Sequence, residues 1–150
     1  MFIKQTIRNI CFSVFVAILF DIIYSILGLL VVDNINIRIV PAVIVITLLC
    51  VLLYVGYMIG QKFFSEAKVK IVSVVIIPMI MLFLLFGFGM LGISVICLIM
   101  QYPVIILIES IGVDIQFTNN PMLFYSMLIF YHLMCCFSLL IGAYHKKHTQ

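Results

Sequence analysis

Long apolar runs separated by short polar stretches divide the chain into four predicted helices. The runs cover residues 9–32, 39–60, 71–94 and 122–144. Each is close to the roughly 20 residues that an α-helix needs to cross a hydrocarbon core about 30 Å thick. The apolar positions are continuous rather than alternating, which argues against the strands of a transmembrane barrel. The pattern therefore predicts an all-α integral membrane protein with a single transmembrane domain, a four-transmembrane-helix bundle.

The third apolar run continues beyond one crossing, to about residue 108. Two interpretations of the excess, residues 94–116, remain open. In the first, it is an extra apolar outer-face segment between helices 3 and 4, re-entrant or interfacial, with a helix that starts at Pro103. Such a segment needs cover from protein or a water-filled cavity. In the second, it belongs to a long, tilted third helix that bends near Gly87, Gly89 and Gly92.

The positions of lysine and arginine distinguish four spans from five, because these residues collect in short cytoplasmic segments. With four spans, Arg38 lies outside and the other seven lie in the cytoplasm: Lys4, Arg8, Lys62, Lys68, Lys70, Lys146 and Lys147. With five spans, the two lysines of the carboxyl tail move outside, and the loop that carries Glu109 and Asp114 moves inside. We therefore predict a multi-pass protein of the cell membrane with both termini in the cytoplasm.

The composition agrees with a membrane protein. Hydrophobic residues make up 67% of the chain and charged residues 9%, whereas soluble domains are about a quarter charged. The net charge of +3 does not indicate a nucleic-acid partner, because the basic residues lie in small groups at the ends of apolar runs. The first apolar run is too long for the core of a signal peptide and no cleavage site follows it, so we expect this helix to be retained. Abundant isoleucine with little alanine is typical of an AT-rich bacterial genome.

Asp21 lies in the middle of the first predicted helix. Residues four apart share a helix face, and the face of Asp21 carries small and polar residues: Ser13, Ala17, Ser25 and Gly28, with Tyr24 beside them. An aspartate at the centre of a span costs about 2.5–3.5 kcal/mol on insertion scales and usually faces the bundle or an aqueous cavity. We therefore expect this face to point into the bundle.

His132 is the expected partner of Asp21, because it is the other strongly titratable group deep in a predicted span. Arg8 lies 13 residues before Asp21, and Lys146 lies 14 residues after His132. At a rise of 1.5 Å per residue the two groups have similar depths. We predict a buried hydrogen-bonded or ionic pair that either couples an ion or proton to function or only joins two helices. The possible secondary partners are Tyr24, Ser25 and Tyr131.

The second predicted helix carries a mildly polar stripe and a pair of glycines. The stripe consists of Thr47, Cys50, Tyr54 and Tyr57. Gly56 and Gly60 are four residues apart, and small residues at this spacing let helix backbones approach closely. We interpret both features as packing surface rather than as ligand sites.

The five cysteines form no redox motif, because the sequence contains no CxxC. His132 and Cys136 lie four apart, but neither further ligands for a metal nor an orienting acid for a cysteine nucleophile is visible. The stretch "HKKH", residues 145–148, suits anionic lipid headgroups better than a metal. We predict no metal, no cofactor and no enzymatic activity.

The sequence names neither a substrate nor a reaction. We expect an accessory, immunity or regulatory membrane protein that acts through helix–helix contacts with a membrane partner. The alternative is a small oligomeric transporter, coupled to protons or another ion, with Asp21 as coupling acid and His132, Tyr24 and Ser25 beside it. A membrane enzyme is less favoured than either. The expected partners are the lipid bilayer and either another membrane protein or further copies of the chain.

Overall fold

The structure, a computed structural model, describes residues 2–34, 39–64, 71–91, 95–111 and 121–148. Within these ranges the regular structure is helical, which confirms the predicted all-α fold. The elements are α1 (Phe2–Asn34), α2 (Ile39–Phe63), the π-helical turn η1 (Val72–Ile76), α3 (Ile77–Leu91), α4 (Val95–Ser110) and α5 (Pro121–His148).

Three helices of the described chain are long and apolar enough to cross a membrane. Their apolar stretches are Ile3–Val31 in α1, Val40–Phe63 in α2 and Phe124–His145 in α5. These stretches overlap the first, second and fourth predicted spans and support a membrane location. The remaining apolar helices are shorter, Val72–Leu85 and Ile99–Ser110.

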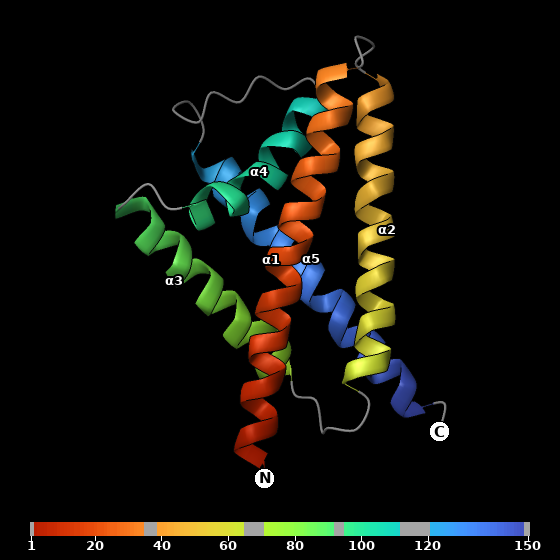
Figure 1. Ribbon diagram of the computed structural model, residues 1–150, viewed down its shortest axis with the longest axis vertical. Helices are drawn as coiled ribbons and strands as arrows, with labels where there is room; N and C mark the ends of the chain where they lie inside the picture. The colour runs from red at the N-terminus through yellow and green to blue at the C-terminus, as the bar shows by residue number, and fades with distance from the viewer. Residues whose placement is uncertain (1, 35–38, 65–70, 92–94, 112–120, 149–150) are drawn as a thin grey trace.

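The helices are arranged with both termini at one end of the molecule (Figure 1). α1 and α2 lie side by side and antiparallel, and α5 crosses behind them. The end of α2 and the start of η1 lie at the same end as the termini, whereas α4 lies toward the opposite end, against α1. The most extensive contact in the bundle is between α2 and α5.

The third predicted span, residues 71–94, falls on η1 and α3, except for residues 92–94, which lie outside the described residues. In η1 the backbone N–H of Ile77 donates to the carbonyl of Val72, five residues earlier. Pro78 follows immediately, and a proline has no N–H and crowds the carbonyl four residues before it. A wider π turn at this point accommodates the missing hydrogen bond.

The residues after α3 form a separate helix, α4, whose direction differs from that of α3 (Figure 1). The interpretation as one long third helix is therefore wrong. The other interpretation, an extra segment whose helix starts at Pro103, is wrong about that start, because α4 begins at Val95 and Pro103 lies inside it. Pro103 is buried and removes one backbone hydrogen bond from the interior of α4.

Small residues bring the backbones of α2 and α5 close together. A methyl group added to Gly60 would collide with the carbonyl of Leu139, and one added to Gly142 would collide with the carbonyl of Tyr57. Gly56 lies against the side chain of Ser138. The interpretation of the second helix's glycines as packing surface is confirmed.

Candidate functional site

The polar face of α1 points into the bundle, as the sequence predicts. Ser13, Ala17, Asp21, Ser25 and Gly28 are all buried. Asp21 has no exposed surface, although it is the most costly of these residues to remove from water. Its position therefore depends on what α5 places opposite it.

α5 places His132 opposite Asp21. The distance between His132 Nε2 and Asp21 Oδ2 is 3.1 Å, and both side chains are at most 1% exposed. The other ring nitrogen, Nδ1, lies 2.8 Å from the carbonyl of Leu128, one helical turn earlier. The structure thus brings together two residues that are 111 positions apart in the sequence.

The two hydrogen bonds of His132 fix the arrangement of protons. A carbonyl oxygen can only accept, so Nδ1 carries a proton and donates it to Leu128. One further proton lies between Nε2 and Oδ2, either on the imidazole as an ion pair or on the carboxyl group as a neutral pair. Both forms have zero net charge, which suits a site without water. Loss of that proton would leave a buried negative charge.

The second carboxyl oxygen of Asp21 has no hydrogen-bond partner among the described residues. Three buried hydroxyl groups also have no hydrogen-bond partner among these residues: Ser13 Oγ, Ser25 Oγ and Tyr131 Oη. A carboxylate oxygen without a partner is more costly than the carbonyl oxygen of a neutral carboxyl group. Within the described residues only one of the two carboxyl oxygens of Asp21, Oδ2, is bonded.

The secondary partners predicted for the pair do not bond to it. The Tyr24 hydroxyl donates to the carbonyl of Val45 on α2, over 3.3 Å. Ser25 Oγ has no partner in the described part of the chain. Tyr131 forms a T-shaped ring contact with His132, with centroids 5.2 Å apart, and a tilted one with Tyr24, with centroids 5.6 Å apart. These tyrosines enclose the pair rather than extend it.

The pair has no metal-site character in the described residues, which contain no group of three or more His, Cys, Asp and Glu residues suited to a metal ion. Cys135 and Cys136, on the same helix as His132, are buried free thiols. The Asp21–His132 pair can hold one proton between two helices and exchange it if a path opens.

The polar stripe of α2 was predicted to be packing surface, and within the single chain this prediction is wrong for three of its four residues. Thr47, Cys50 and Tyr54 are exposed, and Tyr54 has 64% of its surface uncovered. Tyr57 is half-buried and packs on α5, with its ring 5.9 Å from that of His145. Thr47 satisfies its own hydroxyl by donating to the carbonyl of Val43 at 2.7 Å.

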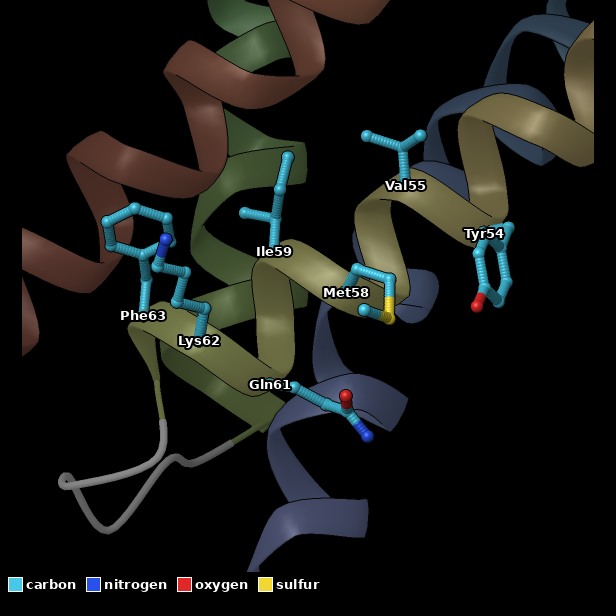
Figure 2. A pocket seen from close by; sticks show the side chains of 7 residues that line it. All are labelled: Tyr54, Val55, Met58, Ile59, Gln61, Lys62 and Phe63. Atoms are coloured by element: carbon cyan, nitrogen blue, oxygen red, sulfur yellow. The ribbon is translucent and has the colours of Figure 1, made fainter.

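An open groove follows the carboxyl-terminal part of the same exposed surface, and no pattern in the sequence analysis identified it. Its volume is about 680 Å³, and Figure 2 shows the side chains around it. The lining residues are Tyr54, Val55, Met58, Ile59, Gln61, Lys62 and Phe63. Most of these residues lie four positions apart in the sequence, and this spacing could have indicated that they share one surface of the helix.

Comparisons of the chain with protein-family models, curated proteins and solved structures found no match. Function is therefore inferred from the geometry of the Asp21–His132 pair and of the outer surface of α2.

Proposed function

We propose that the chain is an accessory, immunity or regulatory protein of the cell membrane that acts through helix–helix contacts with a membrane partner. In this proposal α1, α2, η1 with α3, and α5 are the four spans. α4 is the extra apolar segment at the outer face. No chemical step is assigned to the protein.

The arrangement of the helix ends supports this topology. The start of α1, the end of α2, the start of η1 and the end of α5 share one end of the molecule (Figure 1), and seven of the eight basic residues lie in or next to these helix ends by sequence. Basic residues concentrate on the cytoplasmic side, so both termini are assigned to the cytoplasm. α4, near the opposite end, is then on the outer side.

The observation that carries the proposal is the exposed Tyr54. Lys62 marks the cytoplasmic end of α2, and Tyr54 lies eight residues earlier, about 12 Å deeper at the rise of an α-helix. A hydroxyl at that depth has no water to bond, so an exposed tyrosine is better satisfied by a polar group of another helix than by lipid. α2 is also the least covered of the long helices, with 17% of its apolar window buried against 39% for α1 and 50% for α5.

The buried pair has a supporting role in this proposal. Asp21 and His132 join α1 to α5, and α5 in turn holds α2 through the glycine contact. The pair therefore fixes the frame on which the outer surface of α2 is presented. A direct contact of Asp21 with a partner is not part of the proposal, because its side chain is covered.

The test is affinity purification in mild detergent of the wild type and Tyr54→Leu, with mass analysis of the copurified proteins. Phe130→Leu is the matched control, since Phe130 is an aromatic residue with 63% exposure on α5. We expect a stoichiometric membrane protein with the wild type and the control, and its loss with Tyr54→Leu. Equal recovery of that protein with both variants would contradict the proposal.

A second candidate, an oligomeric proton-coupled transporter, is favoured by one observation, the free Oδ1 of Asp21 beside a proton that either member of the pair can hold. Asp21→Asn tests it, because an asparagine amide can still donate to Nε2 of a neutral His132 but cannot exchange a proton. In vesicles with an internal pH dye, a transporter would show proton flux that this variant abolishes. Absence of flux from the assembled wild-type protein under an imposed pH gradient argues against this candidate.

A further inference from the structure

The groove on α2 lies between two parallel rows of side chains. Residues four apart form ridges along a helix, and here one ridge contains Tyr54, Met58 and Lys62, while the other contains Val55, Ile59 and Phe63. The first ridge is exposed, and in the second Ile59 is half-buried and the Phe63 ring lies 5.1 Å from the ring of Phe12 on α1. The groove therefore runs along the helix axis and opens toward the surroundings of the bundle (Figure 2).

The groove changes character along its length. Tyr54 lies at its deeper end, the apolar side chains of Val55, Met58 and Ile59 follow, and Gln61 and Lys62 lie at the end of α2. There the Lys62 ammonium lies over the Phe63 ring, 5.9 Å from its centroid, and is exposed. An apolar groove that ends in a cation at the edge of a span is complementary to an amphiphile with an acyl chain and an anionic headgroup.

The charge around this end of the molecule is complementary to an anion. Seven basic residues lie in or next to the helix ends of this side by sequence, and Glu66 is the one acidic residue among them. Clusters of lysine and arginine next to membrane spans attract anionic lipids. Gln61 adds an amide next to Lys62, although its nitrogen already donates to the Tyr57 hydroxyl at 2.7 Å.

We propose that this groove is a binding site for an anionic phospholipid. One acyl chain lies between the two ridges against Val55, Met58 and Ile59, and the headgroup phosphate contacts the Lys62 ammonium. The site shares Tyr54 with the proposed partner surface, and it does not depend on a partner being found. It requires only that α2 spans the membrane and ends near the headgroups.

Native mass spectrometry of the purified chain, incubated with an equal mixture of phosphatidylglycerol and phosphatidylcholine, tests the site. We expect the wild type to retain phosphatidylglycerol about fivefold over phosphatidylcholine, the ratio for about 1 kcal/mol from one lysine at an anionic surface. Lys62→Gln should reduce this ratio to about one. Met58→Trp, which fills the groove, should reduce the retention of both lipids.

Lys4→Gln is the matched control, because Lys4 is also exposed, lies at the same end of the molecule and changes the net charge equally. We expect this variant to keep the wild-type preference. Three results would overturn the proposal: no preference in the wild type, an equal loss in the Lys4 and Lys62 variants, or unchanged lipid retention in Met58→Trp. The second of these would mean that general charge, rather than the groove, attracts the lipid.

Discussion

Replacement of Asp21 and His132 by leucine, singly and together, tests whether the two residues stabilise the bundle as a unit. Asp21→Leu leaves His132 Nε2 buried without a partner. His132→Leu leaves both carboxyl oxygens of Asp21 buried without one. The double variant removes both polar groups, so neither is left unsatisfied.

The magnitude follows from the burial and length of the bond. A buried polar group without its partner costs about 1–3 kcal/mol, and both side chains are at most 1% exposed. Polar contacts between membrane helices have measured coupling energies of about 0.6 kcal/mol on average and about 1.7 at most. For a 3.1 Å bond that shares a proton, we expect a coupling energy near that maximum, about 1–2 kcal/mol, the range that model peptides give.

The assay is reversible unfolding in mixed micelles by titration with a denaturing detergent. The chain contains no tryptophan, so the loss of helix is followed by circular dichroism in the far ultraviolet. The free energy of unfolding should fall in both single variants. In the double variant, the loss of unfolding free energy should be smaller than the sum of the losses in the two single variants by about 1–2 kcal/mol.

Additivity within about 0.3–0.5 kcal/mol, the usual result for independent sites, would refute the reasoning. Asp21→Asn gives an internal check, because it retains a donor toward Nε2. This variant should be more stable than Asp21→Leu.

Two further predictions concern the contacts of α2. Gly60→Ala should be less stable than Gly28→Ala by about 1–3 kcal/mol, the usual cost of overpacking. The new methyl group meets the backbone of α5 in Gly60→Ala, whereas it meets a side chain of α4 in Gly28→Ala. The same detergent titration measures the stability of both variants. Tyr24→Phe should lose about 0.5–1.5 kcal/mol of stability with its buried hydrogen bond to Val45, whereas Tyr54→Phe should leave stability unchanged in the isolated chain. Equal effects of the two tyrosine variants would mean that the Tyr24 bond contributes nothing.

The contact between Asp21 and His132 was predictable because two strong constraints agreed. An ionisable side chain in a span must face the interior, and the distance of each residue from its nearest basic anchor gave them a common depth. The hydrogen bonds around the pair were not predictable in the same way. Tyr24 is on the buried face of α1 as expected, but which acceptor it reaches depends on the separation of α1 from α2.

The helix boundaries after α3 were harder to predict, because a continuous apolar run has no hydrophobic periodicity that marks where one helix ends and the next begins. Pro103 looked like a helix start, since proline is common in a first turn, but it lies inside α4. The polar stripe of α2 was misassigned for a related reason. Periodicity gives the faces of a helix, and only packing decides which face the neighbouring helix covers.

Photo-crosslinking in intact membranes from position 51 of α2 tests the central claim most directly, because Val51 lies on the uncovered side of α2 and is 51% exposed. A photoreactive amino acid at position 130 of α5 is the control. We expect a discrete protein adduct from position 51, with either a second copy of the chain or another membrane protein, and only lipid adducts from position 130. Lipid adducts alone from both positions would contradict the claim that α2 contacts a partner.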